Sequence, residues 1–105
     1  MNPSPLPNGR RKYRVSYSAA IREEIQRCQR TATHARRGDQ FLTALRQIVE
    51  RLETDPATYG EPLYRLPALR LQIRCAIARP VFVSFGVSEE QAVVYLREFR
   101  LLGGH

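Results

Sequence analysis

The 105-residue sequence is poor in the residues that build metal sites and disulfide frameworks. It contains two cysteines, Cys28 and Cys75, and two histidines, with no CxxC or HxxxH spacing among them. A structural zinc site needs several such ligands at short, characteristic spacings. Both cysteines lie within apolar patterns, so we expect buried free thiols in a reducing cytoplasm rather than a disulfide, and neither a metal nor a cofactor.

Long apolar runs are also missing. A membrane-spanning helix needs about 20 consecutive apolar residues, and no segment approaches that length. Residues 1–11 lack the apolar stretch of a secretory signal and contain three prolines, which favours a flexible Pro-rich leader. We expect a single domain over residues 12–102, a tail at 103–105 and a cytoplasmic location.

Lysine is nearly absent: Lys12 is the only one, against 16 arginines. The formal net charge is +7 and the isoelectric point is about 10.2. Such a surface attracts polyanions, which here means nucleic acid, ribosomes or an acidic protein. The alternative is a basic surface that only contacts solvent, but the excess of basic over acidic residues favours a polyanionic partner.

Two helices are expected in the first half of the domain. Residues 13–17 alternate and are rich in β-forming side chains, which predicts a short strand. Ser18 can then cap a first helix. A second helix with strong apolar periodicity begins near Gly38 and ends before Pro56, because the residue before proline avoids the helical conformation. Glycine and proline predict a loop over residues 58–62.

The last third of the chain predicts three strands, at residues 69–77, 81–87 and 93–99, from period-two alternation. The whole is then an α+β fold of order βααβββ, with two N-terminal helices on one face of a twisted antiparallel sheet. The residues expected to be buried together are Leu45, Ile48, Leu52, Ile73, Val83, Phe85 and Leu96.

Matching apolar residues across these strands predicts the register. It places Ile73 opposite Val83, and Val83 opposite Leu96. The other face would then collect arginines, aromatic rings and hydroxyls that could hold phosphates and stack bases. An ordinary solvated sheet face is the alternative. The residues of that face would be Arg70, Gln72, Arg74, Phe82, Ser84, Tyr95, Arg97 and Phe99.

Five segments together resemble the RelE/ParE superfamily, the toxins of type II toxin–antitoxin systems. They are Tyr13–Ser18, Asp55–Gly60, Leu71–Arg74, Pro80–Val87 and Val93–Arg97. The resemblance covers about residues 13 to 100. It implies the βααβββ fold, a growth-inhibiting activity, and neutralisation by a cognate antitoxin, a small acidic protein that wraps the toxin.

The resemblance leaves two activities open, because some members poison DNA gyrase and others cleave messenger RNA on the ribosome. In a nuclease, Arg74 and Arg97 would supply cations for the phosphate and Tyr95 would complete the catalytic set. The binding residues implied for either activity are Arg70, Gln72, Phe82 and Ser84.

The groups that would move protons depart from the nuclease pattern. Gln72 occupies the nearest second-strand position and cannot transfer a proton at neutral pH, and Arg100 stands where nucleases often have histidine. A tyrosine hydroxyl such as that of Tyr95 is a poor base near neutral pH. Glu98 is expected to point to the opposite face, and both histidines suit solvated positions.

These departures rank the hypotheses. Gyrase inhibition of the ParE kind comes first, and ribosome-dependent mRNA cleavage of the RelE kind is the alternative. A non-toxic basic binding module, or a decayed toxin, is the third.

Overall fold

Local sequence signals set the limits of both helices. A computed structural model describes residues 12–103, and the leader expected at residues 1–11 lies outside them. Helix α1 (Ala19–His34) starts after Ser18, whose Oγ accepts a hydrogen bond from the Ile21 N–H at 3.2 Å. Helix α2 (Gly38–Thr54) ends at Asp55, directly before Pro56. Both helix predictions are confirmed. Among the described residues no helix is long and apolar enough to cross a membrane.

The strands form one mixed sheet. They are β1 (Arg14–Ser16), β2 (Glu61–Leu66), β3 (Leu71–Ala78), β4 (Val81–Ser88) and β5 (Val93–Leu101). The order across the sheet is β1-β5-β4-β3-β2. Strand β1 pairs in parallel with β5, whereas the other pairs are antiparallel. Parallel neighbours need a long crossover connection, and here both helices and the strands β2 to β4 lie between β1 and β5 in the chain. The predicted α+β class is confirmed, but the prediction of a purely antiparallel sheet is wrong.

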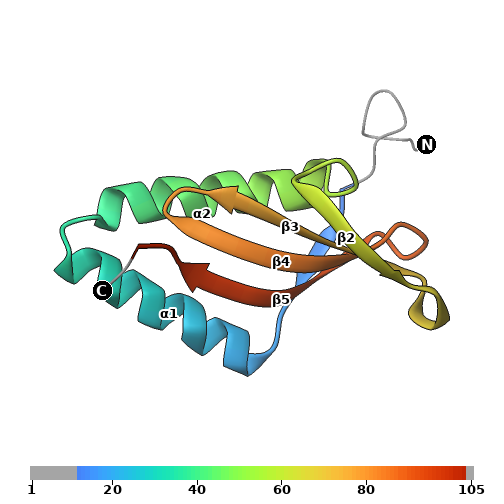
Figure 1. The fold of residues 1–105 in the computed structure, drawn as a ribbon, viewed down its shortest axis with the longest axis horizontal. Helices are drawn as coiled ribbons and strands as arrows, with labels where there is room; N and C mark the ends of the chain where they lie inside the picture. The colour runs from blue at the N-terminus through green and yellow to red at the C-terminus, as the bar shows by residue number, and fades with distance from the viewer. Residues whose placement is uncertain (1–11, 104–105) are drawn as a thin grey trace, which may run out of the picture.

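Strand β2 is an element that the sequence did not predict. It lies at the edge of the sheet and pairs with β3, and a short 3-10 turn, η2 (Pro67–Leu69), joins the two. Gly60 and Pro62 made this stretch resemble a loop, yet an edge strand tolerates proline because one side of its backbone is unpaired. Figure 1 shows β2 and its turn into β3 projecting at the end of the molecule away from the α1–α2 turn.

One face of the sheet packs against the helices. Val83 lies in this core with its two register partners, Ala76 on β3 and Phe99 on β5. Phe99 in turn meets Phe41 of α2 edge-on, with ring centroids 6.0 Å apart. Of the residues expected to be buried together, four are in this core: Ile48, Leu52, Val83 and Phe85. Leu45 and Leu96 are partly buried against them.

The predicted register is wrong. Ile73 lies opposite Gly86 rather than Val83, and Val83 lies opposite Phe99 rather than Leu96. The displacement on β3 is three residues, an odd number, so it turns Ile73 to the face away from the helices. A Cβ built on Gly86 would come within 3.1 Å of Ile73 Cδ1. The glycine therefore leaves the space in which Ile73 is buried.

Both cysteines are free thiols, as predicted. Cys28 is buried in the core, whereas Cys75 is half-buried, so full burial is confirmed for Cys28 only. Burial, and then the nearby Glu24 carboxylate, raises the pKa of the Cys28 thiol above its usual value. Cys28 therefore stays a neutral core residue.

Tyr59 gives a first testable prediction. Its ring is buried, stacks on Phe85 and lies under the Arg51 guanidinium at 4.7 Å, while its hydroxyl has no hydrogen-bond partner among the described residues. An unpaired buried hydroxyl costs about 1–3 kcal/mol. We therefore expect Tyr59→Phe to raise the free energy of unfolding by about 1 kcal/mol, measured by urea denaturation at neutral pH.

The pH dependence provides a second readout of the same substitution. Burial raises the pKa of Tyr59 in the folded protein above its ordinary value of 10.0, although Arg51 opposes the shift. The unfolded tyrosine thus ionises first, and stability present below pH 10 declines as the pH rises further. The phenylalanine variant should lose this part of the alkaline decline. Lower stability of the variant at neutral pH would show that the hydroxyl has a partner.

Candidate binding surface

The face of the sheet turned away from the helices is called here the open face. It is defined by every second residue of β4, starting at Phe82, whose side chains point away from that of the core residue Val83. The residues paired with these on β3 and β5 belong to the same face. Ile73 and Gly86 form its centre, and Ile73 is 1% exposed even though it lies outside the main core. The remaining residues that the register places on this face are Cys75, Ile77, Phe82, Ser84, Ser88, Val93, Tyr95, Glu98 and Arg100.

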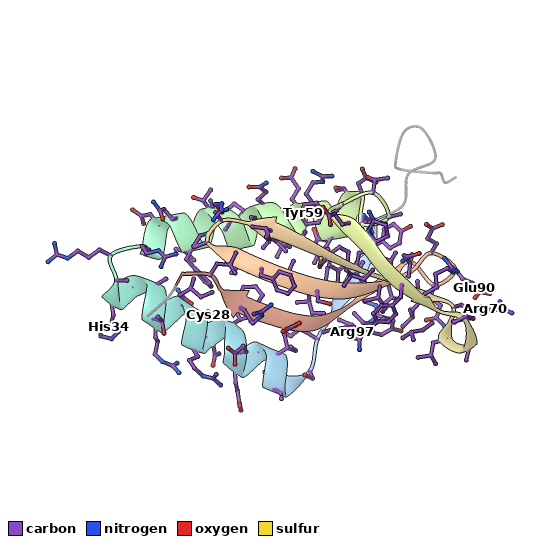
Figure 2. All side chains as sticks on the ribbon, in the orientation of Figure 1. Cys28, His34, Tyr59, Arg70, Glu90 and Arg97 are labelled. Carbon is purple, nitrogen blue, oxygen red and sulfur yellow. The ribbon has the colours of Figure 1, made fainter. Side chains whose placement is uncertain are left out.

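A bulge brings Arg97 to this face. Ser84 pairs with Glu98 and the next residue, Phe85, pairs with Leu96, so Arg97 is an extra residue in β5. Its Nη1 donates to the Tyr64 hydroxyl at 2.9 Å. Tyr64 lies opposite Ile73, which fixes the pair on the open face. Figure 2 shows Arg97 well away from the ends of the sheet.

Tyr64 is a residue that sequence reasoning missed, because its strand β2 was not predicted and the expected loop over residues 58–62 covers the start of that strand. It is 48% exposed and comes from the strand at the opposite side of the sheet from β5. The short apolar–polar–apolar run of Tyr64, Arg65 and Leu66 is the signal that could have predicted this strand, and Pro62 and Pro67 on either side obscure it.

Tyr95, Phe82 and Ser84 lie on the open face as predicted. Tyr95 is 37% exposed opposite Gly86, and its hydroxyl donates to Gln91 Oε1 at 3.3 Å. The Arg100 guanidinium covers the Phe82 ring at 4.5 Å. Ser84 is buried, beneath neighbours rather than presented to a ligand.

Glu98 was predicted to point to the opposite face, and that prediction is wrong. The bulge at Arg97 changes the phase of β5, so Glu98 lies opposite Ser84 on the open face and Phe99 enters the core. The Glu98 carboxylate forms an ion pair with Arg100, with Oε2 and Nε 3.1 Å apart.

Arg74 does not lie with Arg97. Its register partner on β4 is the core residue Phe85, so the side chain is on the helix-covered side of the sheet and only 8% exposed. Its Nε donates to the Tyr59 carbonyl at 2.9 Å and its Nη2 to the Gly60 carbonyl at 3.1 Å. The guanidinium thus holds the loop before β2, and the predicted pairing of Arg74 with Arg97 on one surface is wrong.

Gln72 and Arg70 are also away from the open face. Gln72 lies opposite Val87 of the core, and its Nε2 donates to the carbonyls of Tyr64 and Ile73 at 3.0 and 3.1 Å. Arg70 follows the 3-10 turn with φ of 55° and forms an ion pair with Glu90 at 3.1 Å. Figure 2 shows that pair at the end of the molecule opposite His34.

A second surface is an apolar groove between α1, α2 and β1, with a volume of about 860 Å³. We call it the helix groove. Its floor includes Val15, Ile25 and Leu45, which pack against the core without being fully covered. Three basic residues also line it: Lys12, Arg14 and Arg22. Glu53 is its one acidic lining residue and forms an ion pair with Lys12 at 3.9 Å.

The described residues offer no cluster of three or more histidine, cysteine or acidic side chains that could hold a metal ion. On the open face, Arg97, Tyr64 and Tyr95 can donate hydrogen bonds and present aromatic rings to a ligand. Comparison of the chain with protein-family models, with curated proteins and with solved structures finds no match.

Proposed function

We propose that this protein is a RelE/ParE-type toxin that inhibits growth by binding DNA gyrase, and that a small acidic antitoxin neutralises it. The order of elements supports this reading, since a strand and two helices precede an antiparallel meander, with one added strand, β2. The surface that would meet the target is the open face around Arg97, Tyr64 and Tyr95. Arginine and tyrosine are, with tryptophan, the side chains enriched in the energetic centres of protein interfaces.

One observation favours binding over catalysis. The sheet separates Arg74 from Arg97 and Tyr95, and two loop carbonyls already engage Arg74. A nuclease of the kind considered from the sequence needs both arginines on one phosphate, beside a proton carrier. Arg97 and the tyrosines remain as recognition groups, which suits a non-catalytic inhibitor.

The helix groove supports the proposal that an antitoxin binds this protein. It leaves apolar side chains of both helices uncovered, and basic residues outnumber acidic ones along its lining. An acidic amphipathic segment would bury the apolar residues and pair with the charges.

Ribosome-dependent mRNA cleavage is the second candidate, and the position of Glu98 favours it. This carboxylate lies on the open face, next in sequence to Arg97, and could accept a proton if its ion pair with Arg100 opened.

Induced expression without the antitoxin separates the hypotheses. We expect growth to stop with loss of plasmid supercoiling while translation continues at first. Inhibition of purified gyrase should need about 30-fold more Arg97→Ala than wild-type protein, the loss typical of an interface arginine worth about 2 kcal/mol. Arg65→Ala is the matched control, because Arg65 lies on β2 opposite Gln72, on the helix-covered side.

Three results would contradict the proposal. Arrest of translation before any change in supercoiling would favour mRNA cleavage, and Glu98→Gln should then abolish it. Harmless expression would favour a basic binding module or a decayed toxin. Equal loss of gyrase inhibition in the Arg97 and Arg65 variants would remove the open face from the mechanism.

A further inference from the structure

Three segments distant in sequence meet at the end of the molecule that carries the α1–α2 turn. The Arg37 guanidinium of that turn donates from Nη2 to the Leu102 carbonyl at 3.0 Å, after the end of β5. The Leu102 N–H donates to the Pro80 carbonyl at 2.7 Å, in the turn between β3 and β4. Figure 2 shows His34 at this end and the Arg70–Glu90 pair at the other. We call residues 30–40, 79–80 and 101–103 the basic end.

The basic end is strongly positive. It holds four arginines and a single acidic residue, Asp39. The four are Arg30, Arg36, Arg37 and Arg79. None of them forms an ion pair within the described part of the chain. At the opposite end, residues 12–14, 53–72 and 88–93 hold five acidic residues and four basic ones. The basic end therefore has an excess of three positive charges, whereas the opposite end has no positive excess, and this contrast makes the basic end a candidate site for an anionic partner.

A cavity of about 300 Å³ lies within the basic end. Arg37 and Arg79 line it from two different turns, together with Gln40, Pro80 and Leu102. The bond to Leu102 fixes the half-buried Arg37, while Arg79 is exposed. Helix α2 starts beside it without a side-chain cap, and the partial positive charge of a helix N-terminus adds to that of the guanidinium groups. Two guanidinium groups facing one hollow suit a phosphate.

We propose that the basic end binds the sugar-phosphate backbone of a nucleic-acid duplex, with a phosphate seated between Arg37 and Arg79. Arg30 and Arg36 would contact adjacent phosphates. A duplex fits better than a single strand, because single-strand binding relies on aromatic side chains that stack unpaired bases. Among the described residues, the exposed tyrosines are Tyr17, Tyr64 and Tyr95, all outside the basic end, where His34 is the one aromatic ring. The proposal uses no residue of the open face, so it stands apart from the proposed function.

Fluorescence anisotropy with the full-length protein and a short labelled DNA duplex of mixed sequence tests this inference. Three or four neutralised phosphates predict a slope of about −3 in log affinity against log salt concentration. The double variant Arg37→Gln, Arg79→Gln should bind about tenfold more weakly or worse, and its slope should be smaller in magnitude by about 2. Arg37→Lys, Arg79→Lys keeps both charges and should keep most of the slope.

Arg46→Gln, Arg65→Gln is the matched control. It removes the same charge from exposed positions outside the basic end, and it should leave the slope unchanged. Thermal melting of each variant checks that the fold is intact, since Arg37 also holds Leu102.

Four outcomes would overturn the inference. One is equal weakening in the two glutamine double variants, which would mean attraction by net charge alone. Tighter binding to the single strand than to the duplex is another, and absence of duplex binding at low salt is a third. The fourth is a thermal shift with inorganic phosphate but no binding of the duplex, which would mean a free-phosphate site only.

Discussion

Arg74→Ala should lower the free energy of unfolding by about 2–4 kcal/mol, because hydrogen bonds to a charged group contribute about 1.5–3 kcal/mol and the carbonyls left behind would be poorly hydrated. The side chain is almost fully buried, and its two hydrogen bonds hold the carbonyls of Tyr59 and Gly60. These residues form the entry to β2, so the edge strand should loosen with them. Urea denaturation measures the loss, and hydrogen exchange in residues 59–66 locates it.

Two variants make this result interpretable. Arg97→Ala removes an exposed arginine from β5, which is separated from β3 by β4. Substitutions at exposed positions usually change the free energy of unfolding by no more than about 0.5 kcal/mol. Arg74→Lys keeps the charge but loses the fixed fork that reaches two carbonyls, so it should be intermediate. If Arg74→Ala were as mild as Arg97→Ala, the guanidinium would not be holding the loop. Arg74 would then be available for a ligand.

The helices were predictable from the sequence because their limits depend on local chemistry. Ser18 accepts the hydrogen bond of an N-cap, and Asp55–Pro56 stops α2 whatever the rest of the fold does. These signals need no knowledge of distant residues.

The register of the sheet was not predictable in the same way, because β3 is apolar on both faces. Ile73 is buried on the open face, while Ala76 and Ala78 are buried against the helices. The prediction matched apolar residues by size and hydrophobicity, so it assigned the larger side chains of β3, such as Ile73, to the face that packs against the helices. The structure instead places small residues where helices pack closely and leaves Gly86 to accommodate Ile73. A displacement by an odd number of residues then reverses every side chain of the strand.

The candidate surface was predictable only in part for the same reason. Phe82, Tyr95 and Arg97 do share a face, because their strands were read in the correct alternation up to the bulge. Arg74 and Gln72 look like solvated residues in sequence, yet they satisfy backbone groups of β2 and the loop before it. Tyr64 could not be found before β2 was known to exist.

Gly60→Ala should be the most damaging substitution of a small residue in the described chain, with a loss of at least about 3 kcal/mol. Gly60 has φ of 70°, in the left-handed region that costs an alanine about 1–2 kcal/mol. The larger part comes from contact, because an added Cβ would lie 2.0 Å from the Cys75 carbonyl oxygen and 2.8 Å from Ala76 Cβ. Both belong to β3, whose strand pairing fixes them.

Gly103→Ala separates these two contributions. Gly103 has φ of 63°, nearly that of Gly60, but an added Cβ would meet no atom within 4 Å. Its variant should lose only about 1 kcal/mol, the strain of the backbone alone. The difference between the two variants in urea denaturation then measures the clash with β3. A Gly60 variant no less stable than the Gly103 variant would mean that β2 can separate from β3 at little cost. Strand β2, which carries Tyr64 to the open face, would in that case be a movable edge and not part of the rigid sheet.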